Sequence, residues 1–179
     1  MTRVTRNDWI QFGLDTLVAE GHSQLKAGAL AKRLNVSRGS FYWHFDDLAA
    51  YHSALVAAWG EASVNIATEL AACATPQEKL LLLMQSAGGS DFALERAFRA
   101  WGSEHAAIGA QVDQLDHLRL QVVHSIVREA VADPLEAEHL AKFIYAAAIG
   151  LVSLGADTVG LGKAEIANVI NALLGANSR

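Results

Sequence analysis

Apolar residues recur at spacings of three and four along most of the chain, and this periodicity is the feature that most limits the fold. Side chains at such spacings lie on one face of an α-helix. No segment alternates apolar and polar residues as a half-buried strand does, and no internal repeat or low-complexity stretch occurs. With 52% apolar and only 18% charged residues, the chain can bury a substantial core. We therefore predict an all-α fold of about nine helices.

Residues that cap or stop helices mark most of the predicted boundaries. Thr5 and Asp8 resemble a capping box, Gly21 suits a helix C-terminus, and Pro76 and Pro134 suit first turns. The predicted helices cover residues 6–20, 27–34, 48–73, 79–87, 92–102, 108–131, 134–154 and 163–174, with a short helix after Ser37. A helix over 48–73 would be about 39 Å long at 1.5 Å per residue, too long for a compact three-helix head. It would therefore lead into a second domain, which gives predicted domains at 1–47 and 48–179.

The segment Val36–Phe45 combines a turn, a short helix and an unusual density of aromatic residues. Ser37 is a suitable N-cap, and Phe41 and Phe45, four residues apart, would anchor one face of the helix inward. The outward positions would be Arg38, Ser40, Tyr42, Trp43 and His44, while Gly39 would let the backbone approach a groove closely. Such a helix suits the major groove of DNA, as the recognition helix of a helix-turn-helix.

The charge distribution agrees with a DNA-binding head on a protein that is otherwise acidic. The net charge is −5; residues 1–52 carry six basic and five acidic side chains, and residues 53–179 carry eight and fourteen. This balance argues against a general nucleic-acid coat protein. The single Cys73 rules out an intrachain disulfide, the N-terminus does not resemble a signal peptide, and the longest apolar stretch, 143–154, is shorter than a membrane span. We expect a soluble cytoplasmic protein.

Residues 5–52 resemble the DNA-binding head of tetracycline-repressor (TetR)-type transcriptional regulators. The matching features are Gly21, Leu30-Ala31, the run Val36-Ser37-Arg38-Gly39-Ser40-Phe41-Tyr42 and the pair His44-Phe45, followed by a long helix. The resemblance implies a homodimer that binds a palindromic operator. It also implies that a small-molecule effector in the second domain releases the DNA, so that the protein acts as a repressor. Activation instead of repression stays open.

The predicted DNA-binding residues combine the groove argument with the resemblance. Arg38 can contact guanine through two hydrogen bonds, and the Trp43 indole can pack on a thymine methyl group. By resemblance, Tyr42 and His44 contact phosphates. The family often has Lys at the position of Leu48 and Thr at that of Lys26, which leaves open whether a phosphate contact has moved to Lys26. The full set is Lys26, Ser37, Arg38, Gly39, Ser40, Tyr42, Trp43 and His44.

Two further sets of residues are predicted in the second domain. An aromatic stripe with polar tips predicts a pocket for an apolar or aromatic effector, although such a stripe is as often plain core. Its residues are Phe98, Trp101, His105, Leu115, Val122 and Tyr145. Two apolar helices near the end of the chain predict a four-helix dimer interface, with an intrachain hairpin as the alternative. Its residues are Leu140, Phe143, Ile144, Ala147, Leu151, Ile166, Val169, Ile170 and Leu173.

The sequence shows no signature of catalysis or metal binding. No nucleophile with a neighbouring base and no glycine-rich phosphate loop is recognisable, so no cofactor is expected. His105, His117, His124 and His139 include no pair at the i,i+4 spacing of a two-histidine metal site. We therefore expect a regulator and no enzyme. The alternatives are an all-α enzyme or binding protein, and a regulator whose second domain only dimerises.

Overall fold

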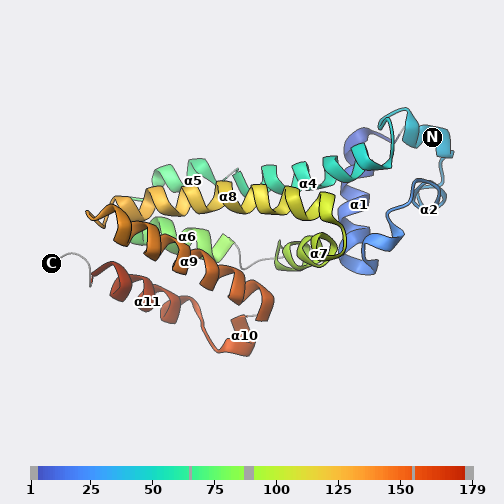
Figure 1. Cartoon of the computed structure of the whole chain (residues 1–179). Coiled ribbons are helices and arrows are strands. Elements are labelled where there is room, and N and C mark those ends of the chain that lie inside the picture. The colour runs from blue at the N-terminus through green and yellow to red at the C-terminus, as the bar shows by residue number, and fades with distance from the viewer. Residues whose placement is uncertain (1–3, 65, 87–90, 155, 176–179) are drawn as a thin grey trace. The chain divides into compact units, whose positions relative to one another are not determined.

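The computed structural model describes residues 4–64, 66–86, 91–154 and 156–175, and every regular element in these ranges is a helix (Figure 1). The contacts between residues divide the chain into two compact units. The first unit is Met1–Val64 with Ala93–Asp113, and the second is Asn65–Phe92 with Gln114–Arg179. The helices are α1 Arg6–Glu20, the 3-10 turn η1 His22–Gln24, α2 Ala27–Arg33, α3 Arg38–Tyr42, α4 Leu48–Val64, α5 Ala67–Ala72, α6 Pro76–Ser86, α7 Asp91–Glu104, α8 Ala106–Arg128, α9 Pro134–Leu154, α10 Ala156–Val159 and α11 Lys163–Gly175.

The predicted all-α fold is confirmed, and most of the predicted helices match to within a few residues. The prediction of one helix over 48–73 is wrong, because α4 ends at Val64 and α5 begins at Ala67, with Ile66 in a turn. The glycine-containing stretch after Leu154 also holds one short helix, α10, that was not predicted. The predicted division after residue 47 concerns function and stays a prediction; by contacts, α4 belongs to the first unit.

In the first unit, α1 begins as its sequence predicts. The Thr5 hydroxyl accepts a hydrogen bond from the Asp8 backbone N–H, and the Asp8 carboxylate accepts one from the Thr5 N–H at 2.7 Å. This capping box satisfies two of the N–H groups that a helix start leaves without partners. Gly21 follows with a φ of 81°, a conformation that favours glycine. Trp9 and Leu17 then bury the inner face of α1.

The core of the second unit is formed by apolar side chains from α6, α8, α9 and α11 and from the turn between α8 and α9. They are Leu80, Val123, Ile126, Val127, Val131, Ala137, Leu140, Ala141, Ile144, Ile170 and Leu174. On the surface of this unit, the Lys79 ammonium of α6 lies 2.7 Å from the Glu129 carboxylate beyond α8. The helices α9 and α11 run in opposite directions and are joined through α10 (Figure 1).

The helix α9 carries more apolar side chains than the core of its unit buries. By length and composition alone it could cross a membrane, and only 22% of its most apolar window is buried. Phe143 and Leu154 are 61% and 64% exposed. One such helix is weak support for a membrane span, and exposed apolar side chains that gather in a patch are typical of an interaction surface.

Candidate nucleic-acid interface

The turn before α3 is built by local hydrogen bonds. Asn35 has a φ of 55°, in the left-handed region that asparagine tolerates better than most residues. Ser37 follows in an extended conformation, and its hydroxyl accepts a hydrogen bond from the Ser40 N–H at 3.3 Å. Ser37 is therefore the N-cap of α3, as the sequence predicts.

Two phenylalanines hold α3 in place. Phe41 and Phe45 are 0% and 4% exposed, as their four-residue spacing predicts. The Phe41 ring packs edge-to-face on two other rings. Its centre lies 5.4 Å from the centre of the Trp9 ring of α1 and 5.1 Å from that of the Tyr51 ring of α4. Aromatic pairs in this geometry are stabilising beyond the area they bury. The short helix is therefore fixed by α1 and α4 rather than by its own length.

The opposite face of α3 presents a cation and two aromatic rings to solvent. Tyr42 is 46% exposed and Trp43 is 69% exposed. The Arg38 guanidinium donates to the Tyr42 hydroxyl at 3.0 Å and lies 5.5 Å from the centre of its ring. Arg38 is thus held along the outer face of the helix, where its remaining N–H groups can meet an acceptor on a ligand.

His44 has a structural contact that sequence reasoning missed. Its Nε2 lies 3.0 Å from the carbonyl oxygen of Val4, forty residues earlier in the chain. A carbonyl oxygen can only accept, so Nε2 carries the hydrogen and Nδ1 of the neutral ring is an acceptor. In that state the ring can donate to a phosphate only after it takes up a second proton. The Arg6 guanidinium lies 5.1 Å from the centre of the Phe45 ring, so the start of the described chain packs on the end of this segment.

The charged residues around α3 are unevenly placed. Lys26 is exposed at the N-cap position of α2 and makes no capping hydrogen bond. The Arg33 guanidinium of α2 pairs with the Glu20 carboxylate at 2.7 Å. Leu48 is half-buried at the start of α4, and the Asp47 carboxylate caps this helix by accepting from the Ala50 N–H at 2.7 Å. Lys26 and Arg38 are therefore exposed cations of this region that can meet an anionic ligand.

No protein-family model matches the chain, and no curated protein matches it. Solved structures match over nearly its whole length. A transcriptional regulator from Rhodococcus sp. RHA1 has a TM-score of 0.77 and 14% identity, covering 97% of this chain and 95% of its own. A TetR-like transcriptional regulator from Rhodococcus sp. RHA1 has a TM-score of 0.67 and 14% identity, covering 97% and 96%. The transcriptional regulator FadR from Bacillus subtilis, in complex with stearoyl-CoA, has a TM-score of 0.71 and 14% identity, covering 97% and 98%.

The fold is that of the TetR-like transcriptional regulators. In this TetR-like fold, the residues predicted for DNA binding all lie in the first unit, from the start of α2 to the end of the turn after α3. At this level of identity the likeness concerns the fold. The roles of the individual residues stay predictions.

The residues predicted to line an effector pocket are divided between the two units. Phe98, Trp101 and His105 belong to the first unit, and Leu115, Val122 and Tyr145 to the second. Phe98 and Trp101 are buried among other aromatic rings, with Phe98 stacked on Trp59 at 4.5 Å. Val122 is 41% exposed. A common pocket for all six stays a prediction.

Tyr145 does have the polar partner that an orienting group needs. Its hydroxyl donates to the Asp116 carboxylate at 2.7 Å, and the Arg119 guanidinium lies 4.0 Å from the same carboxylate oxygen. Burial, and next the hydrogen bond to Asp116, raise the pKa of the Tyr145 phenol. The phenol therefore stays a donor at any physiological pH.

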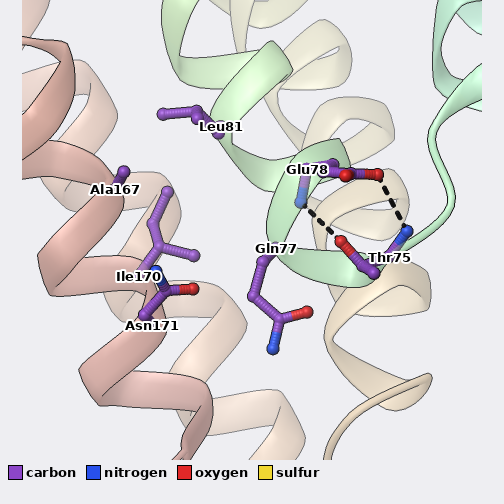
Figure 2. A pocket seen from close by; sticks show the side chains of 7 residues that line it. All are labelled: Thr75, Gln77, Glu78, Leu81, Ala167, Ile170 and Asn171. Atoms are coloured by element: carbon purple, nitrogen blue, oxygen red, sulfur yellow. Dashed lines mark hydrogen bonds between the residues drawn. The ribbon is translucent and has the colours of Figure 1, made fainter.

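A pocket lies in the second unit at residues other than those predicted to line one. It has a volume of about 450 Å³ and lies between α6 and α11 (Figure 2). Its lining residues are Thr75, Gln77, Glu78, Leu81, Ala167, Ile170 and Asn171. The Glu78 carboxylate accepts from the Ala74 and Thr75 N–H groups and so caps α6. The Thr75-x-x-Glu78 pattern marks that cap, but no pattern in the sequence marks the pocket.

The predicted dimer residues divide into an inner and an outer set. Leu140, Ile144 and Ile170 are buried in the core of their own unit, and their place in a dimer interface stays a prediction. Phe143, Ala147 and Val169 are exposed. Leu151, Ile166 and Leu173 are half-buried.

Among the described residues, no group of three His, Cys, Asp or Glu side chains could hold a metal ion.

Proposed function

We propose that the protein is a dimeric, DNA-binding transcriptional regulator that a small-molecule effector releases from a palindromic operator, and that it acts in the cytoplasm. The observation that carries the proposal is the face of α3, where Arg38, Tyr42 and Trp43 are presented to solvent on a helix anchored by Phe41 and Phe45. The TetR-like fold supports it. A short helix held rigidly, with donors and flat rings outward, suits direct readout in the major groove.

Each proposed DNA contact follows from the functional group of the side chain. Arg38 would read a guanine, and Trp43 would pack on a thymine methyl group. Lys26 and Tyr42 would bind phosphates, while Ser40 and the backbone at Gly39 would lie against the groove. Ser37 acts first as the cap of α3. His44 would hold the start of the chain through Val4 and would reach a phosphate through Nδ1 when protonated.

The test is to select duplexes from a random-sequence library and to measure binding at one fixed salt concentration. Arg38→Ala is expected to weaken operator binding by about 1–3 kcal/mol and to relax preference at one base pair. Arg38→Lys keeps the charge but not the paired hydrogen bonds, so it should relax preference with a smaller loss of affinity. Lys163→Ala, on the exposed start of α11, is the matched control. Failure to select any duplex would refute the proposal.

The dimer is supported by the exposed apolar residues of α9 and α11. Phe143, Leu154 and Val169 are 61%, 64% and 49% exposed, and Phe143, Ala147, Gly150 and Leu154 recur on one face of α9. Covering this face by a second copy would bury it as a four-helix bundle. We expect Phe143→Glu to yield monomers in sedimentation at micromolar concentration. Leu135→Glu, at an equally exposed leucine on α9, is the control. A wild-type protein that sediments as a monomer would contradict the dimer.

An apolar or aromatic effector is supported by the buried rings of the first unit and by the half-buried Tyr145–Asp116 pair of the second. The solved FadR structure contains stearoyl-CoA, so a long acyl chain is a reasonable first candidate. Thermal-shift screening of lipophilic and aromatic compounds would find a ligand by its stabilisation of the folded state. A compound that raises the melting temperature should also lower operator affinity. A protein that no compound stabilises would instead be a regulator without an effector.

A further inference from the structure

Three histidines converge on one tryptophan in the first unit. His22 comes from η1, His52 from α4, and Trp101 and His105 from the end of α7 and the residue after it. His22 is stacked on Trp101 at 5.9 Å with an interplanar angle of 4°, and His52 meets Trp101 edge-on at 4.7 Å. The rings of His22 and His105 are 4.8 Å apart. We call these four residues the histidine cluster.

The histidine cluster joins the start of the helix-turn-helix to α4 and α7. His52 Nε2 lies 3.3 Å from the carbonyl oxygen of Leu25, which is 1% exposed and ends η1 just before α2. The carbonyl can only accept, so Nε2 donates and the neutral ring already has its partner. Because Leu25 directly precedes Lys26 and α2, this bond fixes the position of α2 against α4.

Charged and titratable groups surround His52 in the histidine cluster. Glu104 lies 3.4 Å from His22 and compensates a charge there. His22 faces His52 from η1, and His105 faces it from the junction of α7 and α8; both oppose a positive charge on His52. Protons on both His22 and His105 would place like charges on rings whose centres are 4.8 Å apart, and Glu104 would offset one of them.

Burial of His52 adds to this opposition. Burial lowers the pKa of His52, and the nearby His105 and His22 lower it further, while the hydrogen bond to Leu25 acts in the other direction. A base whose folded-state pKa is lowered binds more protons when the structure opens. The packed arrangement is therefore fully stable above the ordinary histidine pKa of 6.5 and loses stability as the pH falls below it.

We propose that the histidine cluster is a proton-binding site that regulates DNA binding: on acidification, repulsion among the imidazolium rings separates η1 from α4 and releases the operator. The inference rests on the DNA-binding function proposed above. Protons would act on the helix-turn-helix directly, independently of any effector in the second unit. The only atoms that change are the ring nitrogens, which take up protons from solvent.

The test compares DNA affinity at about pH 7.5 and about pH 5.5, at one ionic strength, for duplexes selected at the higher pH. Wild-type affinity should fall by up to about tenfold for each proton that the open form binds preferentially, because only the pH unit below the ordinary histidine pKa of 6.5 contributes. His52→Gln keeps a donor for Leu25 but does not titrate, so its affinity should fall by much less. His139→Gln, at an exposed histidine of α9, should behave as the wild type. His44 is present in all three proteins, so it cannot account for a difference among them.

If the His52→Gln protein fails to fold, a second measurement on the wild-type protein still tests the inference. In wild-type protein without DNA, the His52 ring protons should carry a ring-current shift from Trp101 at neutral pH and lose it on acidification, while the helical circular dichroism persists. Parallel pH profiles for wild type and His52→Gln, or a ring-current shift that persists at about pH 5.5, would overturn the inference. A library that yields no duplex at any pH would refute the DNA-binding function alone, because the ring-current measurement needs no DNA.

Discussion

Gly13 and Tyr51 form a matched pair at the centre of the first unit, and Gly13→Ala tests how tightly it is packed. Tyr51 of α4 is 0% exposed, and its hydroxyl donates to the carbonyl oxygen of Trp9 at 2.9 Å. A Cβ atom at position 13 would lie 1.9 Å from that hydroxyl oxygen and 2.9 Å from a Leu55 methyl group. The Tyr51 ring also contacts Phe41 and Phe45 at 5.1 and 4.8 Å, so it cannot move without disturbing α3.

The magnitude follows from three contributions. Overpacking a core costs about 1–3 kcal/mol. Displacing the buried Tyr51 hydroxyl from its acceptor costs about 1–3 kcal/mol more. Alanine recovers about 1 kcal/mol because glycine is unfavourable within a helix. We expect Gly13→Ala to lower the free energy of unfolding by about 3 kcal/mol, and the melting temperature by about 6–12 °C for a chain of this size.

Thermal and urea unfolding, followed by circular dichroism, measure this effect. Gly28→Ala is the matched control: it is a helical glycine of α2 whose added Cβ meets nothing within 4 Å, so it should stabilise the protein by up to about 1 kcal/mol. Adding Tyr51→Leu to Gly13→Ala should cost less than Tyr51→Leu costs in the wild type, since the clash with the phenol is gone. A Gly13→Ala protein as stable as the wild type would refute the argument.

Two further predictions concern α3. Ser37→Ala should destabilise the free protein by about 1 kcal/mol in urea unfolding, because α3 loses its N-cap; an unchanged free energy of unfolding would mean that the cap contributes nothing. Replacing single thymines of a selected operator by uracil removes only the 5-methyl group. One such replacement should weaken wild-type binding by about threefold to tenfold and leave Trp43→Ala binding unchanged, and equal losses for both proteins would exclude a Trp43–methyl contact.

The helix boundaries that were predicted correctly depend on residues close together in sequence. Thr5 and Asp8 cap α1 within one turn, and Pro134 begins α9. The break near Ile66 was missed because apolar residues keep their helical spacing across it, and neither glycine nor proline occurs there. Periodicity shows which face of a segment is apolar. It does not show whether the backbone hydrogen bonds continue from one turn to the next.

In the candidate DNA-binding site, too, only the features that depend on nearby residues were predictable from the sequence. The turn, the Ser37 cap and the inward face of Phe41 and Phe45 all follow from spacings of at most four residues. The contact between His44 and Val4 spans forty residues, and the histidine cluster brings together residues 22, 52, 101 and 105. No local pattern encodes such contacts, because they depend on how α1, α4 and α7 pack.

The predicted dimer interface shows why spacing alone could not separate an inner from an outer surface. Phe143 and Ile144 are adjacent in sequence, yet Phe143 is 61% exposed and Ile144 is 4% exposed; Val169 and Ile170 differ in the same way, at 49% and 2%. Adjacent residues on a helix point about 100° apart, so a helix with apolar residues over more than half its circumference offers two possible faces. The buried face of α9 is fixed by α6, α8 and α11, which leaves the face of Phe143 as the one that the proposed dimer would cover. A charge at Ile144 should therefore unfold the second unit, whereas a charge at Phe143 should only separate two folded copies.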